Sequence, residues 1–295
     1  MTSETDSNQM KPETIAVSFQ KGGTGKTFNS LNIAGGLSAR GFDVLLIDLD
    51  PQGSLTANLG KRDLYEDIDE FSLDQLLMNV DKWDQIDELV LTDHEEFDFI
   101  PANDTFTGNK TPLDSASASE KRLEKALNNL TKEYHYIVCD CPPDLSAYTK
   151  NAITVSGNVV VPMRPESETI FSIRDQWESL QVLSMMHDIE INYLGYVLTY
   201  NSTKLTKEKK KVISWCEENT NPLVQVDDRA AFDRAKWQQG SIYCHAESLR
   251  NDQLPVYDEI VQLVLERTIP PSYGLDVNAA KEMSPEDIRA EAGGN

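Results

Sequence analysis

Short uninterrupted runs of apolar residues recur along the chain, separated by stretches in which apolar residues repeat every three or four positions. The runs predict β-strands at residues 14–19, 43–48, 97–101, 135–140, 158–162, 193–199 and 222–226. The other stretches predict helices from a Gly-rich turn to about residue 40 and near 119–131, 145–155, 168–187, 205–217 and 254–267. Continuous apolar strands are typical of a sheet covered on both faces. We therefore predict an α/β fold with a doubly wound, mostly parallel sheet and right-handed crossovers.

One acidic segment interrupts this alternation. Residues 61–98 carry apolar positions at helical spacing among fourteen acidic and three basic residues, and we predict a mostly helical insertion there. The regular pattern predicts a single domain over residues 14–267, preceded by a short polar extension at 1–13. Residues 268–295 are predicted to form a flexible polar tail, with one short helix that starts at Ser284-Pro285 because serine caps helices well and proline suits the first turn.

The composition narrows the classes of protein that fit this pattern. The 295 residues include 49 acidic and 27 basic side chains, and the formal net charge of −22 excludes a wholesale basic nucleic-acid binder. The chain has no apolar run long enough to span a membrane, and its N-terminus is too polar for a signal peptide, so we predict a cytoplasmic protein. Such acidity resembles that of proteins from extreme halophiles, whose acidic surfaces keep them hydrated in concentrated salt.

The cysteines and histidines indicate no separate site. Four cysteines in a chain of this length form no disulfide framework and no CxxC pair with a matching second half, so free thiols are predicted. Cys139 and Cys141 flank Asp140 and invite a metal-site interpretation, but we favour buried small apolar side chains. The four histidines are scattered along the chain.

A glycine-rich segment, Gln20 to Thr27, lies between the first predicted strand and the first predicted helix. Its glycines allow backbone N–H groups to surround a phosphate, and the following helix adds its positive N-terminal end. We expect Lys26 to neutralise the β- and γ-phosphates and the Thr27 hydroxyl to bind Mg²⁺. The general P-loop pattern has glycine where this chain has Gln20, and this chain has Lys21 beside it. The alternative, a Gly-rich turn without a ligand, fits this string poorly.

Three motifs together carry a resemblance to a known family. They are KGGTGKT at 21–27, LLIDLDPQGSLT at 45–56 and YIVCDCPPDL at 136–145. This set resembles the deviant-Walker ATPases of the ParA/MinD group, and most of all the ParA partition proteins. A weaker similarity continues through residues 159–173 and 228–243, so that the resemblance spans roughly residues 14–267.

The resemblance implies a P-loop NTPase fold of the deviant-Walker type, with ATP and Mg²⁺ as ligands and an ATP-dependent sandwich dimer. Lys21 is expected to reach the phosphates of the partner's nucleotide, because charge that builds on the γ-phosphoryl group in the transition state needs a cation. Asp50 matches the family's residue that orients the attacking water. The resemblance places these further residues at the nucleotide: Gly22, Gly23, Thr24, Gly25, Lys26, Thr27, Phe28 and Asn201.

Two more aspartates end predicted strands. Asp48 lies two residues before Asp50, so both carboxylates point to the same side if the extended structure continues. We assign Asp48 to the Mg²⁺ shell, together with Asp140, which closes the strand 135–140 and resembles the Walker B acid. A single aspartate at a strand end is better explained as a helix cap, but three in one motif context favour the nucleotide site.

One residue departs from the family pattern. Many relatives carry a small polar residue after the double proline, where this chain has Asp144. An added carboxylate there either tunes the Mg²⁺ affinity or caps the helix that follows, and we favour the cap.

A basic stretch contrasts with the acidic chain. Residues 204–236 hold eight basic and six acidic residues. On a helix from 204 to 217, lysines occupy one stripe and apolar residues another. A solvated helix face is the alternative, but the resemblance implies nonspecific DNA binding by the ATP dimer through basic residues in this half of the chain. The candidates are Lys204, Lys207, Lys210, Lys211, Arg229, Arg234 and Lys236.

These features predict a ParA-type ATPase that binds DNA nonspecifically on the nucleoid and positions a plasmid, a chromosome or another cargo. A centromere-binding or adaptor protein is expected to stimulate hydrolysis. About 14 residues precede the first strand. They leave no room for the N-terminal helix-turn-helix domain of larger partition ATPases, so autorepression by operator binding is not expected.

Three alternatives share the P-loop. A MinD-like positioning ATPase at a membrane needs a basic amphipathic C-terminal helix, whereas residues 276–295 hold five acids and two bases, so no membrane partner is expected. An iron–sulfur carrier ATPase needs paired cysteines at the dimer axis. A ligase such as dethiobiotin synthetase has a signature different from the DLDPQG segment at 48–53.

Overall fold

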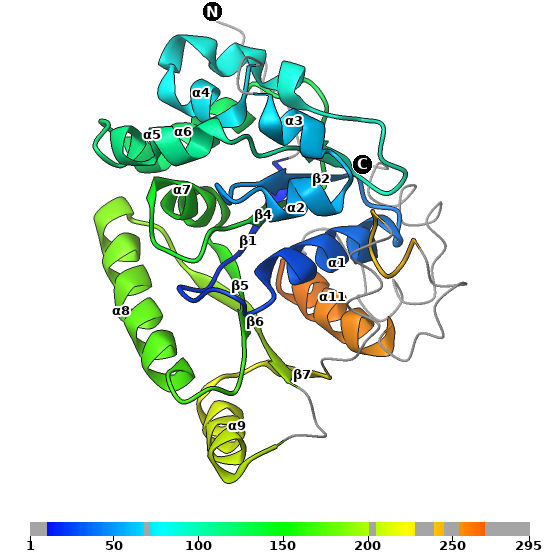
Figure 1. Ribbon diagram of the computed structural model, residues 1–295, viewed down its shortest axis with the longest axis vertical. Helices are drawn as coiled ribbons and strands as arrows, with labels where there is room; N and C mark the ends of the chain where they lie inside the picture. The colour runs from blue at the N-terminus through cyan, green and yellow to red at the C-terminus, as the bar shows by residue number, and fades with distance from the viewer. Residues whose placement is uncertain (1–10, 68–70, 201–204, 228–238, 245–253, 269–295) are drawn as a thin grey trace, which may run out of the picture.

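The computed structural model describes residues 11–67, 71–200, 205–227, 239–244 and 254–268. Its strands form one parallel sheet in the order β3-β2-β4-β1-β5-β6-β7 (Figure 1). They are β1 (Glu13–Val17), β2 (Val44–Asp48), β3 (Asp98–Ile100), β4 (Tyr136–Asp140), β5 (Asn158–Met163), β6 (Asn192–Tyr200) and β7 (Leu223–Asp227). Each lies within two residues of its predicted limits, which confirms the predicted parallel α/β fold.

Both faces of the sheet are covered, because successive side chains of the central strands enter two different cores. In β2, Leu45 and Ile47 belong to one core, whereas Leu46 belongs to the other. The helices α1 (Lys26–Ser38) and α11 (Leu254–Thr268) contact each other and cover the face of Leu46. Burial on both faces explains why the strands read as continuous apolar runs.

The opposite core is covered by elements from the middle of the chain (Figure 1). They are α4 (Leu73–Met78), the 3₁₀ helix η1 (Val80–Leu89), α5 (Thr105–Asp114), α6 (Arg122–Leu127), α7 (Ala147–Ser156), α8 (Thr169–His187) and α9 (Lys207–Asn219). Shorter pieces are α2 (Ser54–Asn58), α3 (Arg62–Glu66) and the 3₁₀ turn η2 (Ser119–Lys121). The helix predicted near 119–131 was too long, because the structure ends α6 at Leu127 and the backbone then turns, with the N–H groups of Asn129 and Leu130 bonded to carbonyls three residues earlier.

The acidic segment 61–98 contains α3, α4, η1 and the first residue of β3. Its apolar residues Leu73, Leu76 and Ile86 are fully buried in the core of the domain. The segment therefore packs on the sheet through its apolar positions. The limits of the domain stay a prediction. No helix among the described residues is both long enough and apolar enough to cross a membrane.

The order of the strands places three chain segments at one edge of the sheet. The neighbours β2, β4 and β1 are parallel, and Asp48 is in register with Asp140, which is in register with Val17 of β1. The connections from β1 and β4 lead to opposite sides of the sheet, and ligands of open α/β sheets bind at such a switch point. The carboxyl ends of β1, β2 and β4 therefore define the candidate site.

Candidate nucleotide-binding site

The loop from β1 to α1 is shaped by glycines at the two positions that need them. Gly23 and Gly25 have φ values of 72° and 93°, in the left-handed region that other residues avoid. Gly25 is the N-cap of α1, and no described side chain caps this end or places an acid in its first turn. The backbone N–H groups at the start of this 13-residue helix thus face the loop without a capping side chain from the described residues. This arrangement suits a phosphate group.

Lys26 is the first residue of α1 and is almost completely buried, with 7% of its surface exposed. Its Nζ donates to the backbone carbonyl of Lys21 at 2.9 Å, so the side chain folds back over the loop. Burial lowers the pKa of Lys26, and the charges of Asp140 and Asp50 act in the opposite direction. The ammonium group therefore lies among acids at the loop, as a phosphate-binding lysine should.

Lys21 forms an ion pair within its own chain. Its Nζ lies 2.6 Å from Oε2 of Glu166 and 3.6 Å from Oε2 of Glu168, which precede α8. The pairing lowers the pKa of Glu166. That Lys21 reaches the partner's nucleotide stays a prediction. Such a contact would require Lys21 to leave Glu166.

Asp48 is fully buried and its carboxylate organises the chain that follows β2. Oδ1 accepts a hydrogen bond from the Asp50 N–H at 3.1 Å, while Oδ2 accepts from the N–H and the hydroxyl of Thr56 at 2.9 and 2.7 Å. Burial raises its pKa to about 7, against the effect of the Thr56 hydrogen bonds. Both oxygens already have protein donors, and the assignment of Asp48 to the Mg²⁺ shell stays a prediction.

Asp140 is also fully buried, but its carboxylate is less satisfied. Oδ1 accepts from the Ser30 hydroxyl at 3.0 Å, whereas Oδ2 has no hydrogen-bond partner among the described residues. Burial and the charge of Asp48 raise its pKa well above the ordinary value, and the Thr27 hydroxyl opposes that shift. An unsatisfied buried carboxylate oxygen near a hydroxyl fits Mg²⁺, which takes one or two protein carboxylates and completes its shell with water and phosphate oxygens.

Asp50 lies in the loop after β2 and is only partly buried. One oxygen, Oδ1, accepts from the Gln52 N–H at 3.0 Å. Burial raises the pKa of Asp50, as does the charge of Asp144, while Lys26 lowers it. The side chain therefore shares the electrostatic environment of Lys26, which agrees with a position beside the phosphates.

The acidic segment supplies one wall of this loop. The Tyr65 hydroxyl of α3 donates to the Pro51 carbonyl at 2.8 Å and to Asp104 Oδ1 at 3.2 Å. Gly53 lies under the Tyr65 ring, and a Cβ there would come within 2.3 Å of ring atoms. The sequence pattern gave no sign that Tyr65 would contact the loop of Asp50.

Known proteins share these motifs and this architecture. A family model described as an AAA domain matches residues 12–192. Soj, the sporulation initiation inhibitor protein of Bacillus subtilis, is 35% identical over 187 residues, or 63% of this chain and 71% of Soj. The chromosome partitioning protein ParA of Myxococcus xanthus is 31% identical over 186 residues, 63% of this chain and 64% of that protein. The chain belongs to the ParA family.

The fold of this ParA-family chain also matches that of McdA from Cyanothece, solved as an ATP complex of a variant. The TM-score is 0.75 at 18% identity, and the match covers 88% of this chain and 98% of McdA. The family membership identifies the chain as a P-loop NTPase.

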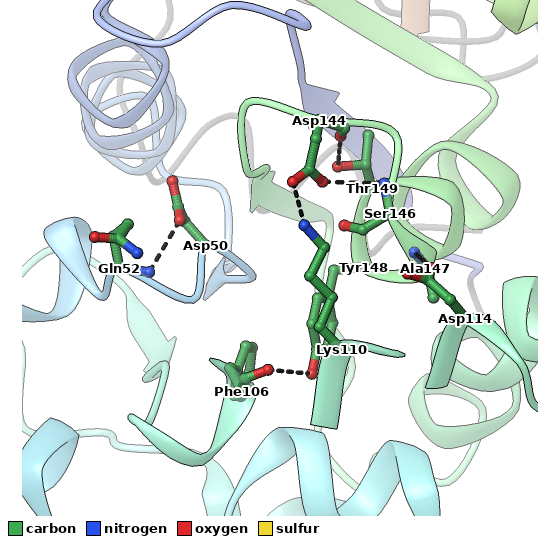
Figure 2. A network of polar contacts seen from close by, with 10 residues as sticks. All are labelled: Asp50, Gln52, Phe106, Lys110, Asp114, Asp144, Ser146, Ala147, Tyr148 and Thr149. Carbon is green, nitrogen blue, oxygen red and sulfur yellow. Dashed lines mark hydrogen bonds and ion pairs between the residues drawn. The ribbon is translucent and has the colours of Figure 1, made fainter. Parts of the chain in front are cut away.

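The side chain of Asp144 has two partners in the structure (Figure 2). Its Oδ1 accepts from the Ser146 N–H at 3.0 Å, but Ser146 is itself the N-cap of α7, and the first helical N–H, that of Ala147, donates to Asp114. The predicted capping role was therefore wrong, because Asp144 lies too early in the chain and fixes the turn before α7. Its Oδ2 forms an ion pair with Lys110 of α5. The sequence analysis singled out Asp144, but nothing in the sequence pattern indicated that Lys110 would be its partner.

The predicted DNA-binding helix has the expected two faces. In α9, Lys207, Lys210 and Lys211 are exposed, whereas Val212 and Cys216 are buried on the core. A side-chain hydrogen bond caps its start, from the Lys209 N–H to Thr206 at 3.3 Å. The remaining candidates lie outside the described residues: Asn201, Lys204, Arg229, Arg234 and Lys236.

Phe28, which the resemblance placed at the nucleotide, lies in the first turn of α1. Its ring packs edge-on against Tyr257 of α11, with ring centres 5.7 Å apart. The ring therefore joins α1 to α11. The predicted contact of Phe28 with the nucleotide stays a prediction, because this packing involves only protein residues.

Proposed function

We propose that this chain is a partition ATPase that binds ATP with Mg²⁺, forms a sandwich dimer in the ATP state, and hydrolyses ATP when a partner stimulates it. One observation carries the proposal: Lys26, Asp50 and Asp140 lie together at the loop between β1 and α1, where no side chain of the described residues caps the start of α1. The names of Soj and ParA and the ATP complex of McdA support it.

Each residue of the loop has a task that its surroundings suit. Lys26 exchanges the Lys21 carbonyl for phosphate oxygens, which cancels charge in a buried place where the interaction is strong. Thr27 and Asp140, with Asp48 behind them, would hold Mg²⁺. When bound, the ion neutralises phosphate charge. Asp50 orients the attacking water, since its loop is fixed by Asp48, Tyr65 and its own bond to the Gln52 N–H.

Dimerisation completes the site in this proposal. Lys21 leaves Glu166 and stabilises charge on the partner's nucleotide, the task that an arginine finger has in other P-loop enzymes. The exchange favours ATP, because the terminal phosphate offers more negative charge than one carboxylate. The ion pair with Glu166 thus represents the resting state of Lys21.

The exposed lysines of α9 provide the DNA contact. A dimer carries two such faces, and contacts of lysine with phosphates are nonspecific and weaken steeply with salt. The dimer therefore binds the nucleoid in the cytoplasm, and a centromere-binding or adaptor protein ends the bound state by stimulating hydrolysis. Cargo attached to that partner is positioned. We also propose that residues 14–267 form one ATPase domain, with an acidic insertion at 61–98 and a polar tail at 268–295.

Retention on nonspecific DNA with ATP and Mg²⁺ tests the switch. The wild type should be retained with ATP and released with ADP, and Lys26→Ala should lose retention because it no longer holds the phosphates. Asp50→Ala should be retained, but should hydrolyse ATP about a hundredfold or more slowly. Lys132→Ala, in an ion pair with Asp98, is the matched control and should behave as the wild type. Equal retention of Lys26→Ala and wild type would overturn the proposal.

A further inference from the structure

The ion pair between Lys110 and Asp144 lies at the nucleotide site but has no role in the mechanism above. Lys110 extends from α5 to Asp144, which lies in the loop after β4, four residues beyond Asp140 (Figure 2). The two side chains are 38% and 42% exposed. Exposed ion pairs contribute little to folding stability, so stability alone does not explain the pair.

The position of α5 does not depend on Lys110. The Phe106 ring of α5 stacks on Tyr148 of α7 with ring centres 4.8 Å apart, and the Tyr148 hydroxyl donates to the Phe106 carbonyl at 3.3 Å. At the other end of α5, Asp114 accepts from the Ala147 N–H at 2.5 Å. These contacts dock α5 on α7 from both ends (Figure 2). Lys110 is therefore free to act through its charge.

The charge of Asp144 reaches the phosphate-binding residues. It raises the pKa of Asp50 and acts on Lys26, and Lys110 acts on Asp50 with the opposite sign. Asp48, Asp50 and Asp140 already bring three carboxylates to this edge of the sheet. A fourth, uncompensated carboxylate would repel the phosphates of ATP.

We propose that Lys110 is a positioning residue of the nucleotide site, which holds Asp144 in an ion pair and so cancels a charge that would repel the phosphates of ATP. The inference rests on the proposed ATP binding. It explains why an acid is tolerated at this position, because α5 supplies its counter-charge. Lys110 acts through Asp144 and does not itself contact the nucleotide.

The test is a double-mutant cycle in which the affinity for a fluorescent ATP analogue is measured with Mg²⁺ present. Lys110→Met should weaken binding about tenfold, because Asp144 is left unpaired. Asp144→Ser keeps an oxygen that can accept from the Ser146 N–H, and alone it should change affinity less than about twofold. The variant with both substitutions should return to within about twofold of the wild type, since the repelling carboxylate is gone.

Three controls separate this role from a structural one. Lys110→Arg keeps the charge and should bind as the wild type. Tyr148→Phe removes a contact of α5 without changing charge, and it should also bind normally. The defect of Lys110→Met should shrink below about threefold in 1 M KCl, because salt screens charge effects.

The possible results are distinct. If wild type binds the analogue and Lys26→Ala does not, the proposed ATP binding holds. In that case, normal binding by Lys110→Met, or failure of Asp144→Ser to restore it, would overturn the role of Lys110 alone. A loss of analogue affinity in Tyr148→Phe equal to that in Lys110→Met would also overturn the role of Lys110. If wild type does not bind the analogue, the proposed function fails and this inference fails with it.

Discussion

At the scale of the residue, Asp48 and Asp140 occupy paired positions on neighbouring strands yet have different surroundings. Both are fully buried, and burial raises the pKa of each. Asp48 accepts three hydrogen bonds, from Asp50 and Thr56, whereas Asp140 Oδ2 lacks a partner in the part of the chain that the structure describes. The same side chain thus organises a loop at one position and is available to a cation at the other.

This contrast predicts opposite effects of two isosteric substitutions. Asp140→Asn keeps the acceptor for Ser30 and removes a buried charge, so its stability should be unchanged or greater, while Mg²⁺-dependent ATP affinity should fall about tenfold or more. Asp48→Asn puts an amide donor against existing donors, and it should lower the free energy of unfolding by about 1–3 kcal/mol. Thermal unfolding and nucleotide binding with and without Mg²⁺ check both. Equal Mg²⁺ dependence in Asp140→Asn and wild type would contradict the assignment.

At the scale of the element, the regular helices and strands followed from local pattern, while α5 did not. The apolar runs located the strands of the described residues, and α9 was found by its stripes of lysine and apolar residues. In α5, Gly108 and Pro112 argue against a helix, since both have low helix propensity. The element is held by its ends on α7, through Phe106 and Asp114. Tertiary contact thus outweighed propensity at this position.

The exposed face of α9 carries a prediction about DNA. Replacing Lys207, Lys210 and Lys211 together by alanine should weaken ATP-dependent DNA binding about tenfold or more, with a smaller dependence on salt, because fewer counterions are released. ATP hydrolysis without DNA should be unchanged, since these side chains point away from the core. DNA binding as a function of salt concentration measures both quantities.

The matched control replaces three exposed lysines on other elements, Lys121, Lys125 and Lys132, by alanine. This variant has the same net charge as the α9 variant. If both lose DNA binding equally, the effect is one of total charge and α9 is not the contact surface.

At the scale of the whole molecule, charge and assembly are connected. The formal net charge of −22 opposes the association of two chains at low salt. In the described structure, Lys21, which the proposed dimer needs, is paired with Glu166 and lies near Glu168. Under the proposed function, a dimer therefore forms only when the nucleotide competes for Lys21 and supplies new contacts.

Removing that competitor should favour the dimer. Glu166→Gln should lower the ATP concentration at which half of the chains are dimeric by about threefold to tenfold, because Lys21 leaves a neutral partner more easily. Glu168→Gln, 3.6 Å from Lys21 and more exposed, is the control and should have a smaller effect. Light scattering at increasing ATP concentration gives the midpoint. An unchanged midpoint in Glu166→Gln would show that the ion pair does not restrain dimerisation.

The sequence alone determined the strands, the phosphate loop and the aspartates at the strand ends, because each depends on residues that are neighbours in the chain. The tertiary structure decided what those residues contact. Lys21 meets Glu166 and Asp144 meets Lys110 across long separations in the chain. Such pairs arise from the order of strands in the sheet and the docking of α5, which no local pattern encodes.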